Sequence, residues 1–281
     1  MMGLETLLAD PSALWALVLT LVLAGAAIGV LAGLFGVGGG AISVPVFYET
    51  FLRLGLDPDI AMPLAVGTSL AMIIPTAILS ARAHAAKGAL DMDQLKSWAL
   101  PILAGVVVGS AVARYAPAEL FQIVFVAISA IMSFRLLLAN EARPIREGMG
   151  RLGNTAYGAL VGFLSVLMGI GGGAISNLIL TLHGWTMHRA VATSAGVGVL
   201  IAVPGTIGYV LAGWGRPGLP ADALGYVSAS ALVLTLPTAL LCTRLGVGLA
   251  HALPQKALKR LFGGFLLLVA MRFAWAILQS N

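Results

Sequence analysis

Two clusters of glycine and serine are the residues of this chain best suited to bind a solute. The stretches GVGGGAIS at 36–43 and GIGGGAIS at 169–176 differ at one position. Three consecutive glycines predict a break in a helix, because each glycine costs about 1 kcal/mol there relative to alanine. The helix that restarts after such a break has amide N–H groups without intrahelical partners and a partial positive charge. The clusters therefore indicate binding of an anion.

Short hydroxyl and amide side chains accompany both clusters. A second matching pair of motifs, AVGTS at 65–69 and AVATS at 190–194, places a threonine and a serine in the next apolar segment of each half. Several short neutral donors suit an oxyanion better than one full positive charge does. The predicted substrate-binding residues are Gly38, Gly39, Gly40, Ser43, Thr68 and Ser69 in the first half, and Gly171, Gly172, Gly173, Ser176, Asn177, Thr193 and Ser194 in the second.

The elements that position these residues are expected to be membrane-spanning helices. Of 281 residues, 59% are hydrophobic and 10% are charged, and the mean hydropathy is +1.00. A soluble domain has about 25% charged residues. Charge-free stretches such as 11–48 and 152–188 exceed the roughly 20 apolar residues that one crossing needs. The composition predicts an all-α, polytopic helical membrane protein in which residues 1–281 form a single integral membrane domain surrounded by a lipid bilayer.

The paired motifs indicate an internal duplication with glycine-broken helices. Two matching pairs in the same order predict repeat one at about 11–140 and repeat two at about 150–280. Each repeat is expected to contain a long helix, the glycine cluster, a short segment and three further helices. The short segments are predicted at 41–54 and 174–184, and the further helices at 60–81, 97–113 and 118–138 in repeat one and at 188–212, 221–243 and 256–278 in repeat two.

The distribution of lysine and arginine favours inversion of the second repeat. If the short segment after each cluster crosses the membrane, the 16 basic residues divide 12 to 4 between the two sides. If it re-enters and returns, they divide 9 to 7. The positive-inside rule favours the first arrangement. Inverted repeats put both termini outside the cytoplasm and point two helix starts at a shared midplane site, as in many secondary transporters.

Other classes of chemistry are not indicated. Cys242 is the only cysteine, so neither an internal disulfide nor a thiolate metal cluster can form, and the four histidines lack metal-ligand spacing. We find no Ser-His-Asp or paired-carboxylate arrangement, which predicts that the protein is not an enzyme and has no cofactor or metal. The basic residues are scattered at predicted helix ends and form no stripe, so no nucleic-acid partner is expected.

The stretch GLFGVGGGAISVPVF at 33–47, followed by AVGTS and later by GIGGGAIS, resembles the sulfite exporter TauE/SafE family of membrane transporters. The resemblance extends from about Leu14 to about Leu278. It implies a multi-pass protein of the bacterial inner membrane that exports sulfite, organosulfonates or related small sulfur oxyanions.

The family motif differs between the two halves of this chain. Asn177 stands where the first half has Val44, and its side-chain amide adds a hydrogen-bond donor. Ala192 precedes Thr193, where the family commonly has glycine, and is expected to narrow the approach to this threonine. Carried over by motif, the resemblance implies a substrate region made of the first-cluster glycines with Ser43, and of Gly171, Gly172, Gly173 and Ser176.

Three hypotheses for function follow. The leading one is export of a small sulfur-containing anion, bound at the paired helix N-termini after the two breaks. The second is a cation carrier, or a cation-coupled one, that uses backbone carbonyls near Phe35 and Met168. The third is a membrane protein without a transport role. A homo-oligomer is compatible with the sequence, which does not specify the anion, the energy coupling, the subunit number or whether the short segments span the membrane.

Overall fold

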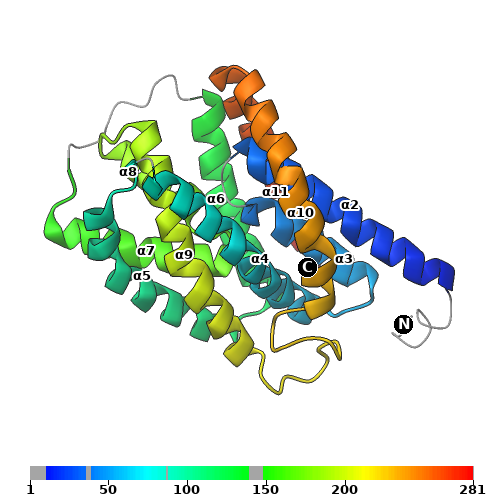
Figure 1. The fold of residues 1–281 in the computed structure, drawn as a ribbon. Helices are drawn as coiled ribbons and strands as arrows, with labels where there is room; N and C mark the ends of the chain where they lie inside the picture. Colours follow the sequence, from blue (N-terminus) through cyan, green and yellow to red (C-terminus); the bar gives the residue numbers. More distant parts are fainter. Residues whose placement is uncertain (1–10, 36–38, 87, 139–147, 281) are drawn as a thin grey trace.

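A computed structural model describes residues 11–35, 39–86, 88–138 and 148–280. Within these ranges the regular structure is helical (Figure 1), apart from one β-bridge between Ala223 and Ser228. The helices are α2 (Pro11–Phe35), α3 (Gly40–Arg53), α4 (Pro58–Ala86), α5 (Met92–Ala113), α6 (Ala118–Leu138), α7 (Arg151–Met168), α8 (Gly173–Leu182), α9 (Met187–Ala212), α10 (Ala229–Ala252) and α11 (Gln255–Ser280).

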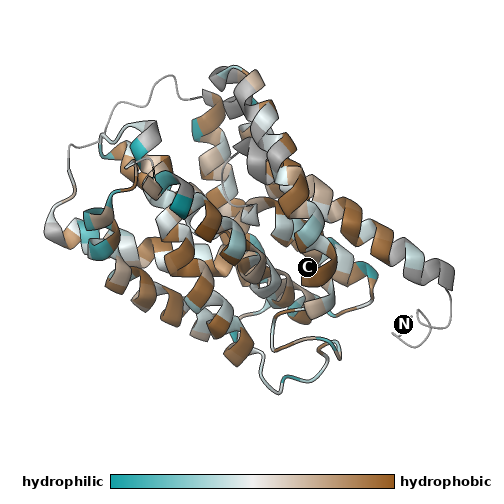
Figure 2. Ribbon diagram, viewed as in Figure 1, coloured by the Kyte–Doolittle hydropathy of each residue, from teal (hydrophilic) through white to brown (hydrophobic). Residues whose placement is uncertain are grey.

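Several of these helices are suited to cross a membrane. Figure 2 shows that hydrophobic residues run along the helices, whereas hydrophilic residues gather mostly at helix ends and connections. This distribution confirms the predicted all-α, polytopic membrane class. Among the described residues, five segments are long and apolar enough to span a bilayer: Pro58–Ala86, Met92–Ala113, Ala118–Leu137, Arg189–Ala212 and Arg260–Leu278.

The two halves of the chain interlock through reciprocal helix pairs. α5 of the first half packs on α7 of the second, and α10 of the second half packs on α2 of the first. The corresponding helices α4 and α9 pack together, as do α6 and α11. Two copies of one motif that exchange helices would produce this reciprocal arrangement. Inversion of the second copy stays a prediction.

Two predicted helix starts were wrong. α5 begins at Met92 instead of 97, because the Asp91 side chain caps it by accepting a hydrogen bond from Gln94 N at 2.9 Å. α10 begins at Ala229 instead of 221, where the Ser228 hydroxyl accepts from Ala231 N at 3.3 Å. The residues before α10 are apolar enough to resemble helix, but an N-cap side chain, and not hydropathy, defines where a helix begins. α6 matches its predicted bounds.

The helices that follow the glycine breaks are short. α3 has 14 residues and α8 has 10. At about 1.5 Å per residue they extend roughly 21 Å and 15 Å, against a hydrocarbon core of about 30 Å. α8 therefore reaches about halfway through a bilayer by itself, and helix length does not decide the relative orientation of the repeats.

A labelling experiment tests this orientation. A cysteine introduced at Asn281, in a chain with Cys242→Ser, is expected to react with a membrane-impermeant maleimide added to intact cells, because an inverted second repeat puts the C-terminus outside the cytoplasm. Residue 281 lies outside the described residues. A cysteine at the exposed Lys96, predicted to be cytoplasmic, should react only after lysis. Protection of both sites in intact cells would indicate parallel repeats.

Candidate functional site

The two glycine breaks lie against each other in the interior of the protein. Gly40 begins α3, and a Cβ added to it would lie 2.4 Å from the carbonyl oxygen of Gly169 and 2.6 Å from Ile170 Cα. Since these are backbone atoms, only glycine permits this approach. Two clusters that are far apart in the sequence thus form one buried region. Gly38 lies outside the described residues.

Both short helices start without a side-chain cap. α3 follows Gly39, with φ of 81°, and α8 follows Gly172, with φ of 74°. This left-handed conformation favours glycine, which has no Cβ to clash with the following carbonyl. Glycine also has no side-chain oxygen, so neither N-cap residue offers a side-chain acceptor to the first-turn amides. Each helix start therefore carries uncapped N–H groups and the positive end of a helix dipole.

The predicted serines pair across the two motifs of each half. Ser43 Oγ lies 2.6 Å from Ser69 Oγ, and Ser176 Oγ donates to Ser194 Oγ at 2.9 Å. Ser69 also donates to the Gly169 carbonyl at 2.8 Å and so connects the first half to the second break. All four serines are buried. In this structure their hydroxyls are bonded within the protein, so direct contact with a solute requires them to exchange partners.

The predicted threonines accept hydrogen bonds from N-cap residues of helices in the other half of the chain. Thr68 Oγ1 donates to the Leu64 carbonyl at 2.7 Å and accepts from Ser228 N, the N-cap of α10, at 3.0 Å. Thr193 Oγ1 accepts from Asp91 N, the N-cap of α5, at 3.2 Å. The two contacts correspond to each other in the two halves. Both threonines are fully buried and tie the halves together.

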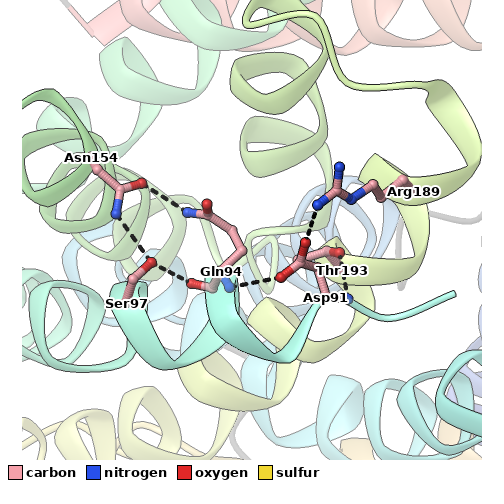
Figure 3. A network of polar contacts seen from close by, with 6 residues as sticks. All are labelled: Asp91, Gln94, Ser97, Asn154, Arg189 and Thr193. Atoms are coloured by element: carbon pink, nitrogen blue, oxygen red, sulfur yellow. Dashed lines mark hydrogen bonds and ion pairs between the residues drawn. The ribbon is translucent and has the colours of Figure 1, made fainter. Parts of the chain in front are cut away.

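The contact at Thr193 belongs to a larger polar network, shown in Figure 3. Asp91 forms an ion pair with Arg189, whose guanidinium carbon lies 4.0 Å from the centre of the Trp185 ring. Burial of the Asp91 carboxyl disfavours its charge, but hydrogen bonds from Gln94 N and from Arg189 outweigh burial and lower its pKa. The ion pair is therefore charged at neutral pH and links the N-cap of α5 to α9.

The same network continues from α5 to α7. Gln94 Nε2 donates to Asn154 Oδ1 at 2.8 Å, and Asn154 Nδ2 donates to Ser97 Oγ at 3.0 Å (Figure 3). Trp98 Nε1 also donates to Asn154 Oδ1 at 2.8 Å. The start of α5 is thus fastened to two helices of the second half, α7 and α9. Of these network residues, only Thr193 was among the predicted substrate-binding residues.

Two buried oxygens beside the second break have no hydrogen-bond partner. They are Oγ of Ser165, in the last turns of α7, and Oδ1 of Asn177, in α8. Ser165 is fully buried and lies beside the α8 start, since a Cβ added to Gly172 would be 3.5 Å from its hydroxyl oxygen. Unsatisfied buried polar groups are rare in proteins, and each needs an explanation. Ser165 thus supplies an unused hydrogen-bond donor next to an uncapped helix start, whereas Asn177 Oδ1 is an unused acceptor within α8.

Asn177 was predicted as a site residue, but Ser165 was not. The available signal was one polar side chain within the apolar run ALVGFLSVLM, directly before the second cluster. Comparison of the repeats concealed it, because the equivalent residue of the first half is Ala32.

Carbonyl groups before the second break are already bonded. The Ser165 carbonyl accepts from Ile170 N at 3.1 Å, and the Gly169 carbonyl accepts from Ser69 Oγ. Each of these carbonyl oxygens keeps a second lone pair, so the cation-carrier hypothesis stays a prediction. The described residues contain no group of three or more His, Cys, Asp or Glu side chains arranged to hold a metal ion.

The apolar helices are those of a multi-pass membrane protein, and the comparisons with known proteins make it a membrane transporter. The chain belongs to the sulfite exporter TauE/SafE family, whose model matches residues 21–273. It is 29% identical over 255 residues to a "Probable membrane transporter protein" of Haemophilus influenzae, covering 90% of this chain and 97% of the relative. It is 28% identical over 255 residues to another of Methanocaldococcus jannaschii, covering 88% and 91%. No solved structure matches the chain significantly. A location of this protein in the bacterial inner membrane is consistent with the bacterial source of the Haemophilus influenzae relative.

Proposed function

We propose that the protein exports a small sulfur-containing anion, such as sulfite, an organosulfonate or a related oxyanion, and binds it where the two glycine breaks meet. One observation carries the proposal: α8 starts without a side-chain cap, next to a fully buried Ser165 hydroxyl that has no partner. Membership of the sulfite exporter family supports a sulfur oxyanion as the substrate.

The groups at the second break match an oxyanion chemically. First-turn N–H groups of α8 carry a partial positive charge, and Ser165 can donate its hydroxyl hydrogen. The amide nitrogen of Asn177 is a further donor on the same helix. A sulfite or sulfonate group has three oxygens around one sulfur and can accept from several such donors at once. Neutral donors hold an anion without the strong attraction that would prevent its release.

Transport requires this buried region to open in turn to each side. The contacts of Thr193 with Asp91 N and of Thr68 with Ser228 N each join a helix start to the opposite half. If the second repeat is inverted, these contacts lie toward opposite faces of the membrane. We infer that each acts as a gate contact, and that release of one while the other holds exposes the site to one side.

Export of an anion does not require a coupling ion. Each negative charge that leaves a cell with a negative interior gains about 2.3 kcal/mol per 100 mV of membrane potential. The membrane potential alone can therefore drive outward transport from a site built of neutral donors.

The variant Ser165→Ala tests the site. It should weaken sulfite binding about fivefold, because a lost hydrogen-bond donor costs on the order of 1 kcal/mol. Ser129→Ala is the matched control, since Ser129 is also fully buried with an unpartnered hydroxyl but lies in α6. Dissociation constants from isothermal titration, with counterflow of radiolabelled sulfite, taurine and sulfoacetate in proteoliposomes, provide the measurement. Equal weakening by both variants, or by neither, would remove Ser165 from the site.

A further inference from the structure

α5 and α9 leave a groove of about 410 Å³ between them, separate from the residues of the glycine breaks. It opens outward, because Val107, Ile207 and Leu211 on its walls are 60%, 55% and 62% exposed. In a membrane protein such a surface faces lipid. The groove is lined by Val107, Ser110, Ala111 and Arg114 of α5 and its end, and by Pro204, Ile207, Gly208, Leu211 and Ala212 of α9.

We propose that this groove binds one anionic phospholipid, with its phosphate at Arg114 and Arg216 and one acyl chain along α5 and α9. Both arginines are exposed at the same end of the groove. Arg114 Nη1 donates to the carbonyls of Leu211 and Ala212 at 3.3 Å and 3.2 Å, and Arg216 Nη1 donates to the Arg114 carbonyl at 2.9 Å. These bonds hold the two arginines close together.

The two guanidinium groups have capacity for a phosphate. Their hydrogen bonds to the described residues all use Nη1, which leaves Nε and Nη2 of each side chain for another acceptor. Arginine binds phosphate in a bidentate, charge-assisted manner. One carboxylate, that of Asp59, lies near the arginine end of the groove. It accepts a hydrogen bond from Ala118 N at 2.7 Å, and Asp59 does not line the groove.

The polar and aromatic residues along the groove lie at depths that match the interfacial layer and the hydrocarbon layer of one bilayer leaflet. Tyr115 and Trp214, 81% and 63% exposed, follow α5 and α9 and mark the interface, where these residue types are enriched. Ser110 lies one turn before Arg114, about 6 Å deeper at 1.5 Å per residue. The polar layer of each leaflet is roughly 5 to 8 Å thick. Ser110 therefore lies at the base of this layer, where the ester groups of a phospholipid are found.

Ser110 supplies an independent indication of a ligand. Its hydroxyl oxygen is buried and has no hydrogen-bond partner, although the residue lines the groove. The oxygen is packed against α9, where a Cβ added to Gly208 would lie 2.3 Å from it, so the hydroxyl must turn toward the groove before an ester carbonyl of a bound lipid accepts from it. Deeper in the groove Val107 and Pro204 present only apolar surface, which suits an acyl chain. Phosphate, ester and chain are thus matched in order by two arginines, a serine and an apolar wall.

Native mass spectrometry of the full chain, purified from mixed phosphatidylglycerol and phosphatidylethanolamine vesicles, tests the proposal. The unmodified protein should retain phosphatidylglycerol in preference. Arg114→Ala and Arg216→Ala should each reduce that preference about fivefold, and the double variant should abolish it. Arg53→Ala is the control, since Arg53 is exposed at the end of another helix, α3, and should change nothing.

A second variant tests the groove itself. Ala111 is exposed on the groove wall, so Ala111→Trp should fill the groove without disturbing the core and should remove the retained phosphatidylglycerol. Arg114→Lys preserves the charge but loses the bidentate contact, so it should lower the preference less than Arg114→Ala does. Undiminished preference in the double arginine variant would overturn the proposal. Retention in Ala111→Trp would also overturn it, because the lipid would then bind outside the groove.

Discussion

Replacement of Gly172 by leucine is expected to abolish transport while the protein still inserts in the membrane. Gly172 has φ of 74°, which costs an L-residue about 1 to 2 kcal/mol. The new Cβ would lie 2.3 Å from Ile201 Cδ1 and 3.1 Å from Val197 Cγ1, so the side chain has no free space. It would also crowd the α8 start and the Ser165 hydroxyl, the groups proposed to hold the anion. Gly39→Leu should behave in the same way, because Gly39 has φ of 81°.

Export of radiolabelled sulfite from proteoliposomes that contain equal amounts of protein measures this effect. Gly264→Leu is a matched control in α11, where an added Cβ meets no atom within 4 Å. It should retain normal transport. Full activity of Gly172→Leu, with correct insertion, would contradict a binding site at the second break.

Substitution of Gly67 by alanine is expected to cause a large loss of stability. A Cβ at Gly67 would lie 2.0 Å from the Tyr226 carbonyl oxygen and 3.0 Å from Tyr209 Cβ. Overpacking of a core usually costs about 1 to 3 kcal/mol, and a clash with backbone belongs at the upper end, since the loop before α10 would have to move. That movement would also disturb the contact between the neighbouring Thr68 and Ser228 N.

The equivalent residue of the second half supplies the control for this variant. Ala192 is fully buried in α9, and Ala192→Gly should cost about 1 kcal/mol, the usual difference between alanine and glycine within a helix. Thermal unfolding of the detergent-solubilised proteins should therefore show a fall in Tm several times larger for Gly67→Ala. Similar falls for both variants would show that the close approach at Gly67 does not limit stability.

Together these two variants separate two uses of glycine in this protein. Gly172 is required by its backbone conformation at a helix start, and its replacement should affect transport. Gly67 is required by a close approach between a helix and a loop, and its replacement should affect stability first. Both lie in motifs that occur in both halves of the chain.

The sequence predicted helix bounds well where long apolar runs form the helix. It predicted them less well where an N-cap side chain sets the start of the helix. The predicted bounds of α6 agree with the structure because Pro117 precedes the helix and a long apolar run, 120–134, forms most of it. The start of α10 was predicted too early, since 221–228 is as apolar as a helix but forms a loop capped by Ser228. Likewise Asp91 adds residues to α5 that their polar character had excluded.

The candidate site was predicted in part. Glycine triplets indicated the breaks, and their repetition in two halves indicated two of them. The hydroxyl residues were grouped with them as possible ligands, because sequence alone shows which groups can donate but not which partners they already have. In the structure Thr68 and Thr193 hold helix caps, whereas Ser165, unmatched in the other half, has none.

By itself the sequence determined that this protein is a helical membrane protein, that two helices are broken by glycine, and to which family the chain belongs. These properties depend on composition and on residues close together in the chain, whose effects on helix formation and lipid solubility are local. Only the tertiary structure showed that the two breaks are in contact and that Thr68 and Thr193 each accept a hydrogen bond from the N-cap of a helix in the other half. It also showed that the Ser165 hydroxyl beside α8 has no hydrogen-bond partner. The first two properties depend on contacts between residues 100 to 160 positions apart, and the third depends on which groups packing leaves around Ser165.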